Sequence, residues 1–335
     1  MHAAAINLRG GVSPRNTRLR GQSIIEYVLI IAVIGLVIVF AGPGVAGAIR
    51  NQFNLVGNTL NSGISGGVEG GGASGGGSTG ADSATVQAAI GKDAKDWTLD
   101  EQEAVAEDIS AKGEASSAYA KAKAAMDAGT KFSVKLTNGK TLEYRIIGID
   151  HDDLADGSGK AGLTFVTKNE AIGKYLMNAD NTAVGGWEKC ELRAKMNSGE
   201  IWNLMPSDFQ SKVKPVRKLT NNVDGTDKNA AVTATTDKLF LLSYSEIVET
   251  PQSSYGWSEY PWIGKEGTQY EAFRDKDINN NGDNDCLTLP ARGEWWERSV
   301  HPQYSVFFGS VGNNGFPGDS NFAAGSSFVC PAWCF

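Results

Sequence analysis

One segment near the N-terminus constrains this chain more than any other. Residues 28–41 are all apolar or glycine, and the uncharged stretch continues to Ile49. An uncharged run of this length is long enough to cross a membrane as a helix. No other run in the sequence is comparable. The sequence therefore predicts one transmembrane helix near the N-terminus.

The residues before this run indicate its orientation. They include four arginines and no acidic residue: Arg9, Arg15, Arg18 and Arg20. Positively charged residues mark the cytoplasmic side of a membrane helix. We therefore expect the N-terminal leader to face the cytoplasm and the rest of the chain to lie outside.

A carboxylate, Glu26, stands at the start of the apolar run and is followed at once by Tyr27. A charged side chain in a membrane segment is costly and therefore marks a functional site by default. The segment GQSIIEY, from Gly21 to Tyr27, and the apolar helix after it resemble the Flp (Tad) branch of the type IV pilins.

This resemblance implies that a prepilin peptidase cleaves after Gly21, so that Gln22 becomes the N-terminus and Glu26 the fifth residue. Glu26 would then meet the free amine of a neighbouring subunit, with Tyr27 beside it. The implied partners are the peptidase, other pilin subunits and the membrane during assembly. A plain N-terminal anchor is one alternative. A secretory signal cleaved near Ala46-Gly47-Ala48 is another.

Composition divides the chain into four parts. A leader at 1–21 precedes the hydrophobic helix, which we place at 22–60. Residues 61–84 are rich in glycine and serine, as in a flexible linker. Residues 85–335 have an ordinary globular composition and form what we call the head. The linker would separate a filament-packing helix from this bulky head.

The head is predicted to be α+β. Residues 85–130 have apolar side chains at helical spacing, and Gly113 should divide them into two helices. Alternating runs at 132–136 and 141–147 flank Asn138-Gly139, a strong hairpin signal. Further strands are expected at 163–166 and 239–242, and short helices at 187–196, 201–204 and 206–213.

Charge and cysteine content limit the partners. Removing the leader takes away four arginines and no acid, so the net charge moves from −7 to −11. An acidic outer portion argues against nucleic acid as a partner.

The four cysteines are Cys190, Cys286, Cys330 and Cys334. Disulfides and free buried thiols are both open, whereas zinc-site spacing is missing from the sequence.

Several strings of the head occur in a characteristic order. They include residues 146–148, 151–154, 157–162, 185–189 and 236–243, and the segment WWERS at 295–299. Together they resemble a bacterial surface-domain family, DUF6273, over roughly residues 97–335. The C-terminus is also similar to the variable proteins of diversity-generating retroelements, which implies a C-type-lectin-like fold. The usual arginine of the closing motif is replaced here by Cys330, which puts any role of that arginine in doubt.

The resemblance implies a variable, ligand-binding region at 299–328. Most residues between Val300 and Phe322 are of types encoded by NNC codons, as adenine-directed mutagenesis would produce, although a plain glycine-rich loop has much the same composition. Aromatic residues would supply rigid contact area, and Ser, Gly and Asn adaptable hydrogen bonds. The candidate contact residues are Val300, His301, Tyr304, Ser305, Phe308, Ser310, Asn313, Asn314, Phe316, Asp319, Ser320, Asn321 and Phe322. Val306, Phe307 and Val311 are assigned to the core.

One loop resembles part of a calcium site. Its oxygen-bearing residues alternate, and Gly282 is at the sharp turn: Asp277, Asn279, Asn281, Asp283 and Asp285. A full EF-hand loop would have glutamate where this chain has Thr288. The alternatives are a calcium ion and a solvated turn rich in Asp and Asn.

The sequence has no nucleophile elbow, phosphate-binding loop or HExxH motif, so we predict that the protein is not an enzyme. The expected function is adhesion, with the head binding a protein or glycan ligand at the bacterial cell surface or on a pilus. Before assembly the chain would reside in the inner membrane. The alternatives are a structural minor pilin and an extracytoplasmic enzyme with a formylglycine-generating-like fold, using His151 or the pair Cys330 and Cys334.

Overall fold

The computed structural model describes residues 83–249, 254–274, 276, 278 and 284–335. The predicted leader, the membrane helix at 22–60 and the linker up to residue 82 lie outside these residues. Within the described part, no helix is both long and apolar enough to cross a membrane. The last two residues of the predicted linker are ordered, because Ser83 caps the first described helix with its side chain.

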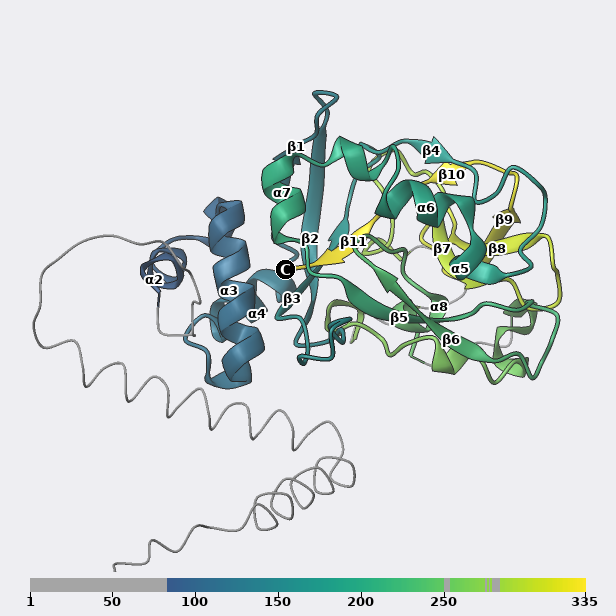
Figure 1. Cartoon of the computed structure of the whole chain (residues 1–335), viewed down its shortest axis with the longest axis horizontal. Coiled ribbons are helices and arrows are strands. Elements are labelled where there is room, and N and C mark those ends of the chain that lie inside the picture. The colour runs from purple at the N-terminus through teal and green to yellow at the C-terminus, as the bar shows by residue number, and fades with distance from the viewer. Residues whose placement is uncertain (1–82, 250–253, 275, 277, 279–283) are drawn as a thin grey trace, which may run out of the picture. The chain divides into compact units, whose positions relative to one another are not determined.

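Three α-helices open the head: α2 (Ala84–Ile90), α3 (Leu99–Lys112) and α4 (Tyr119–Asp127) (Figure 1). The start of α3 is fixed by a capping box between Thr98 and Glu101. It ends at Gly113, whose φ of 58° is in the range that glycine adopts without strain. The predicted break at Gly113 is therefore confirmed, but residues 85–130 contain three α-helices where two were predicted, because Gly91 already caps the end of α2.

Three sheets follow, and the fold is α+β as predicted. The first has the order β1-β2-β3-β11, with β1 (Phe132–Lys135), β2 (Thr141–Ile149), β3 (Leu163–Thr167) and β11 (Ala332–Cys334). The second has the order β4-β10-β7-β8-β9, with β4 (Lys174–Tyr175), β10 (Ser327–Phe328), β7 (Trp295–Val300), β8 (Phe307–Val311) and β9 (Asp319–Phe322). The third pairs β5 (Val216–Asn221) with β6 (Val232–Asp237).

Short helices connect these sheets. They are α5 (Gly186–Lys189), α6 (Glu191–Asn197), α7 (Ser207–Lys212) and α8 (Tyr244–Ile247). The 3-10 turns are η1 (Ala94–Asp96), η2 (Gly113–Ala115), η3 (Trp202–Leu204), η4 (Ser254–Glu259), η5 (Ile263–Lys265) and η6 (Glu271–Phe273). The helices predicted at 187–196, 201–204 and 206–213 are thus confirmed as α5 with α6, η3 and α7.

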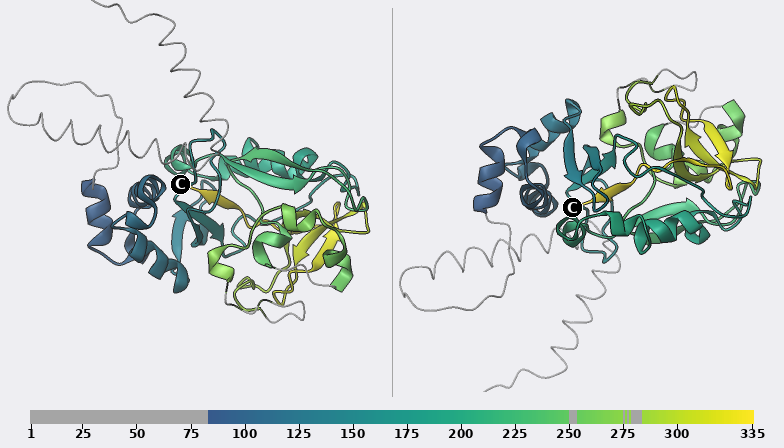
Figure 2. Two further views of the ribbon diagram at one scale, coloured as in Figure 1. Left: turned by 90° about the horizontal axis from the view of Figure 1, so that it is seen from below. Right: turned by 90° about the horizontal axis from the view of Figure 1, so that it is seen from above.

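The predicted hairpin and the strand at 163–166 are also confirmed. Strands β1 and β2 pair antiparallel from Phe132 opposite Tyr144 to Lys135 opposite Thr141. Gly139 has a φ of 84° in the connecting turn, which explains the Asn-Gly pair. Helices α3 and α4 pack on β3 and β2, and the views of Figure 2 show them beside this sheet.

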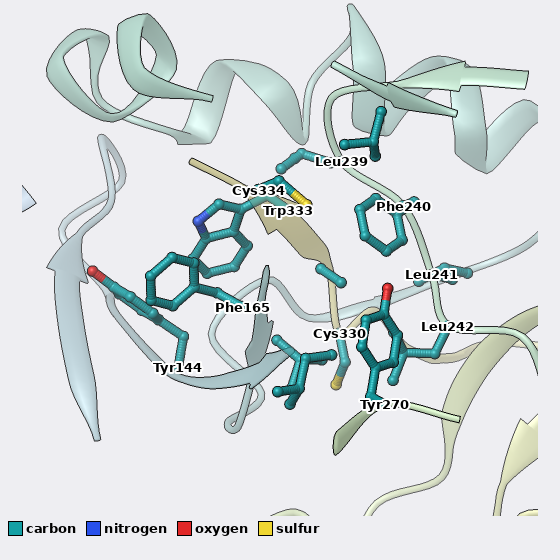
Figure 3. Packing of buried hydrophobic residues seen from close by; sticks show 14 of the residues in the cluster. Tyr144, Phe165, Leu239, Phe240, Leu241, Leu242, Tyr270, Cys330, Trp333 and Cys334 are labelled. Atoms are coloured by element: carbon teal, nitrogen blue, oxygen red, sulfur yellow. The ribbon is translucent and has the colours of Figure 1, made fainter. Parts of the chain in front are cut away.

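The end of the chain completes the core. Trp333 is fully buried on β11, and its ring lies 4.9 Å from that of Tyr144 and 5.8 Å from that of Phe165. Figure 3 shows these rings on one side of β11 and Phe240 and Tyr270 on the other. Residues from the beginning and the end of the head's sequence therefore share one hydrophobic core.

The prediction of a strand at 239–242 is wrong. Its four residues are fully buried, as expected, but they are not in a sheet strand. Only Phe240 forms a bridge, exchanging both backbone hydrogen bonds with Ala332. Burial and a run of leucines indicate a core segment, but they do not supply a second strand long enough to extend the pairing.

Candidate binding surface

The predicted variable region forms the outer strands of the second sheet. Strands β8 and β9 are antiparallel, with Phe307 opposite Phe322 and Ser310 opposite Asp319. The loop between them therefore lies at the far end of the hairpin from Phe307 and Phe322. This geometry divides the predicted contact residues into two groups. Asn313, Asn314 and Phe316 belong to the loop.

A second group centres on an aromatic cluster formed by His301, Tyr304 and Phe322 together with Phe307, which was assigned to the core. The rings of Phe307 and Phe322 have their centroids 4.4 Å apart, and Tyr304 lies 5.6 Å from Phe307. His301 lies 5.4 Å from Tyr304. Tyr304 is 53% exposed and Phe322 is 48% exposed. Two large aromatic side chains are thus half in water while their rings pack on partly covered neighbours.

Segments outside the variable region lie beside those that carry the cluster. The exposed large hydrophobic residues of the described part are Leu176, Val184, Val223, Tyr304 and Phe322. Backbone hydrogen bonds join the segments that carry them: Asn178 to Ala323, Ala183 to Ser305, and Gly185 to Val223. We call these five residues the apolar surface patch. The sequence analysis missed Leu176, Val184 and Val223, because single apolar residues in polar loops carry no periodic signal.

Strand β7 places a buried scaffold under this surface. Trp295, Trp296 and Arg298 are all buried. Arg298 donates two hydrogen bonds to the Glu246 carboxylate and further ones to the backbone carbonyls of Leu241 and Glu266. Paired guanidinium and carboxylate groups with several hydrogen bonds fix geometry strongly. The start of the variable region is therefore held rigidly.

Four of the predicted contact residues are buried, so their assignment to the contact surface is corrected. Val300, Phe308 and Ser310 have no exposed surface, and His301 has almost none. Phe307, which we assigned to the core, is partly exposed, as is Val306, whereas Val311 is buried as predicted. The β7–β8 pairing shifts register between Trp296 and Val300. The two extra residues are on β7, so the side chains of β8 alternate without a break, and Phe308 and Ser310 share one buried face. The apolar pair Phe307-Phe308 does not indicate in advance which of the two rings points inward.

The remaining predicted contact residues are at the surface. Tyr304, Asn313 and Phe322 are exposed. Others are partly exposed: Ser305, Asn314, Phe316, Asp319, Ser320 and Asn321. Asn321 donates a hydrogen bond to Ser327, which ties β9 to β10. These nine residues lie in the β7–β8 loop, in the β8–β9 loop and on β9.

His301 illustrates how the surface is built. Burial lowers the pKa of its imidazole to about 4, because the charged ring would lose its hydration. Its Nδ1 atom has no hydrogen-bond partner among the described residues. The ring of Trp257 packs on it at 5.5 Å. At neutral pH His301 is therefore an uncharged aromatic support for Tyr304.

The predicted calcium residues Asp277, Asn279, Asn281 and Asp283 lie outside the described residues. Asp285 is described and exposed, and its backbone carbonyl accepts hydrogen bonds from Thr288. Across the described ranges, no group of three or more His, Cys, Asp or Glu side chains could hold a metal ion. Calcium binding remains a prediction from the sequence.

All four cysteines are free thiols. Burial raises the pKa of Cys190 to about 12, and it raises the pKa values of Cys330 and Cys334 well above the ordinary range. Such thiols are protonated at neutral pH and poorly nucleophilic. Cys286 is half-buried and lines a small pocket together with Arg145 and Lys168.

His151, the other residue of the enzyme alternative, is next to Asp152, to which the Cys334 thiol donates at 3.6 Å. Its Nδ1 lies 3.2 Å from the Glu271 carboxylate, and its ring stacks on Tyr270 at 4.1 Å. Its Nε2 lies 3.4 Å from the hydroxyl of Thr268, which is exposed. Burial raises the pKa of Glu271, but the hydrogen bond from His151 outweighs this effect and holds that pKa below its ordinary value. This long hydroxyl contact on an open surface supports no particular reaction.

The described residues define an α+β domain whose last strands present a half-exposed aromatic surface. Residues 161–334, slightly more than half of the chain, match the family described as a domain of unknown function, DUF6273. The chain therefore belongs to the DUF6273 family, as its motifs predicted. No curated protein and no solved structure matches it.

Proposed function

We propose that this protein is a surface-displayed, pilin-like adhesin whose head binds a ligand through residues 299–328. One observation carries the proposal: the exposed large hydrophobic residues of the described part gather on adjoining segments around Tyr304 and Phe322. Exposed apolar side chains are normally scattered singly over a protein surface. A gathered group with a polar border is typical of a binding site.

The composition of this surface favours a paratope-like contact. Tyr304, Phe307 and Phe322 offer aromatic area with few rotatable bonds, and Asn313, Ser320 and Asn321 offer adaptable hydrogen bonds. The buried scaffold of β7 is separate from these exposed positions. Substitutions at the exposed positions would therefore change the ligand without unfolding the head.

The C-type-lectin-like class is part of the proposal. What supports it is the topology, in which the first strands of the head and the last strand β11 share one sheet while the variable region occupies another. The pilin assignment rests on the sequence from Gly21 to Tyr27 and on the basic leader. It implies display on the cell or on a pilus after assembly from the inner membrane.

The first experiment is deep sequencing of the codons for residues 299–328 across a population of the source bacterium. We expect substitutions at exposed positions such as Tyr304, Asn313 and Phe322, and none at buried positions such as Phe308. The changes should fall on adenines. A uniform region would remove diversification from the proposal. Substitutions spread equally over buried and exposed codons would contradict the assigned contact surface.

A second experiment tests adhesion itself. A strain lacking this chain is complemented with the full chain or with the double variant Tyr304→Ser and Phe322→Ser, and adherence to bacterial and host cells is counted. We expect the double variant to lose most adherence, roughly tenfold or more, as when two hot-spot aromatics are removed. Lys140→Ser, on the exposed β1–β2 turn, is the control. Equal adherence of all strains would favour a structural pilin with an inert head.

A further inference from the structure

The head contains a buried amine held between two carboxylates. The Nζ atom of Lys218, on β5, lies 2.6 Å from Oδ1 of Asp152 and 2.5 Å from Oε1 of Glu246. The side chain of Lys218 is 3% exposed and that of Asp152 is 4% exposed. Removing charged groups from water is costly unless each finds a partner. The proposed binding function uses neither Lys218 nor Asp152.

Aromatic rings surround the amine. Nζ of Lys218 lies 4.3 Å from the centre of the Phe240 ring and 5.5 Å from that of Tyr270. Figure 3 shows Phe240 and Tyr270 facing the same side of β11. These contacts hold the ammonium group in one place beside the two carboxylates.

The carboxyl group of Asp152 receives hydrogen bonds from neutral donors. Thr164 donates to Oδ2 at 2.6 Å, and the Tyr270 hydroxyl contacts both oxygens at 2.8 and 3.0 Å. Donors fixed around a carboxyl oxygen stabilise negative charge that develops on it during nucleophilic attack. These hydroxyls therefore have the placement of an oxyanion hole.

Glu246 has a different environment, which separates the roles of the two carboxylates. Both of its oxygens are bound by Arg298. Burial raises the pKa of Glu246, but the positive charges of Arg298 and Lys218 outweigh this effect and hold that pKa below its ordinary value. Burial raises the pKa of Asp152, but Lys218 and His151 bring it below its ordinary value, so ionisation does not distinguish the two carboxylates. Their hydrogen bonds do, because the Arg298 guanidinium occupies both oxygens of Glu246, whereas the hydroxyls of Thr164 and Tyr270 surround Asp152. Asp152 is therefore the carboxyl that the amine attacks, and Glu246 is the proton acceptor.

Backbone contacts hold the reacting groups in register. Arg217 donates to the carbonyl of Asp153 at 2.9 Å, and Ala155 donates to that of Pro215 at 3.0 Å. The segment that carries Asp152 therefore runs along the start of β5. Two groups that the fold already holds side by side lose less entropy when a bond forms between them.

We propose that Lys218 and Asp152 form an intramolecular isopeptide bond. Glu246 takes one proton from the Lys218 ammonium, and the neutral amine attacks the side-chain carbonyl carbon of Asp152. One carboxyl oxygen then leaves as water, carrying that proton and a second proton from the amine. The products are a neutral amide, one water molecule and the restored Glu246 carboxylate. No oxidant, reductant or cofactor is needed.

Two consequences make this reaction favourable in the folded head. Condensation removes two buried charges and replaces them with a neutral amide, which relieves the cost of desolvation. It also closes a loop between residues 66 positions apart, which constrains the unfolded chain as a disulfide does. The bond would join the β2–β3 connection to β5 and resist unfolding.

The test is peptide mass spectrometry of the full chain after denaturation, reduction and tryptic digestion. We expect the peptides that contain Asp152 and Lys218 to be joined, with a mass lower than their sum by one water molecule. Trypsin should also fail to cleave after Lys218. Recovery of the two peptides as separate species would overturn the proposal and leave a buried ion pair.

The same digest contains a matched control. Lys160 and Asp153 form an ion pair at 3.1 Å, but their side chains are 45% and 65% exposed. This pair should remain two ordinary residues, because water solvates both ions. A cross-link at Lys160 as well would indicate nonspecific condensation and contradict the mechanism.

Variants test the roles. Lys218→Met should abolish the joined peptide, and Glu246→Gln should reduce the joined fraction at least tenfold while circular dichroism reports whether the fold is kept. A joined fraction unchanged in Glu246→Gln would refute its role as base. If either variant does not fold, the wild-type digest still decides whether the bond exists.

Discussion

Two buried glutamates show how the surroundings of a single residue decide its ionisation. Glu246 is bound by Arg298, whereas neither carboxyl oxygen of Glu297 has a hydrogen-bond partner in the described part of the chain. Burial, followed by the nearby charge of Glu266, raises the pKa of Glu297 well above its ordinary value. A group whose pKa is raised on folding stabilises the protein at low pH and loses that contribution as the pH rises.

Replacing each glutamate by glutamine should therefore give opposite results. We expect Glu297→Gln to change the free energy of unfolding by less than about 1 kcal/mol at pH 7, or to increase it, since the amide carries no charge to bury. We expect Glu246→Gln to lower it by about 3–5 kcal/mol, because Arg298 loses its charged partner. Urea unfolding of both variants measures this. Equal losses would contradict the assigned ionisation.

The ionisation of His301 gives a second prediction at this scale. Its pKa of about 4 is below that of an exposed histidine, so the unfolded chain binds more protons between about pH 6.5 and 4. This contribution to stability is complete above about pH 6.5 and is lost as the pH falls. NMR titration should show a neutral His301 ring down to about pH 4. In His301→Phe, the loss of stability between pH 7 and 4 should be smaller by about 1–3 kcal/mol. An NMR midpoint near 6.5 would show that the ring is solvated.

The contact of one helix with one strand depends on a single glycine. A Cβ atom added to Gly162, just before β3, would lie 1.8 Å from the backbone carbonyl oxygen of Ala106 on α3. Backbone atoms cannot yield as the tip of a side chain can. Helix α3 therefore approaches the first sheet as closely as it does only because this position lacks a side chain.

We expect Gly162→Ala to lower the free energy of unfolding by about 2–4 kcal/mol, through separation of α3 from β3. Gly264→Ala is the matched control, because its added Cβ would have nothing within 4 Å and the residue is exposed. The control should stay within about 0.5 kcal/mol of the wild type. Thermal unfolding of the two variants compares them. Similar melting temperatures would mean that α3 can shift without cost.

Elements with local signals could be predicted from the sequence. The hairpin at Asn138-Gly139 and the helix stop at Gly113 depend on neighbouring residues, and both are confirmed. The inward and outward faces of β8 could not be predicted, because its sequence FFGSV shows no alternation of apolar and polar residues that would tell Phe307 from Phe308. The apolar surface patch was also missed in part, since the segments that carry Val184 and Val223 are joined by a tertiary hydrogen bond, from Gly185 to Val223, that leaves no local signal.

At the scale of the whole molecule, the closing strand joins parts that are far apart in the sequence. Trp333 packs on Phe165 of β3 and on Phe209 of α7, with ring centroids 5.8 and 5.0 Å apart. The same strand bridges to Phe240. The variable region thus lies between two fixed parts, the scaffold of β7 and the closing strand β11. Variation at exposed positions leaves both intact.

The stability of the whole head should therefore depend on Trp333. We expect Trp333→Ala to cost about 3–5 kcal/mol in the free energy of unfolding, because a large cavity opens where β3, α7 and β11 meet. Trp333→Phe should cost only about 1–2 kcal/mol. Phenylalanine keeps much of the packing and removes the indole N–H, which is buried without a partner in the described structure.

Tyr304→Ala is the control, since its side chain is largely in water and its loss should change stability by less than about 1 kcal/mol. Chemical denaturation of the three variants ranks them. A large loss for Tyr304→Ala would show that the aromatic surface is needed for folding and is less free to vary than proposed. A small loss for Trp333→Ala would mean that the head folds without its closing strand, so that the two fixed parts need not act together.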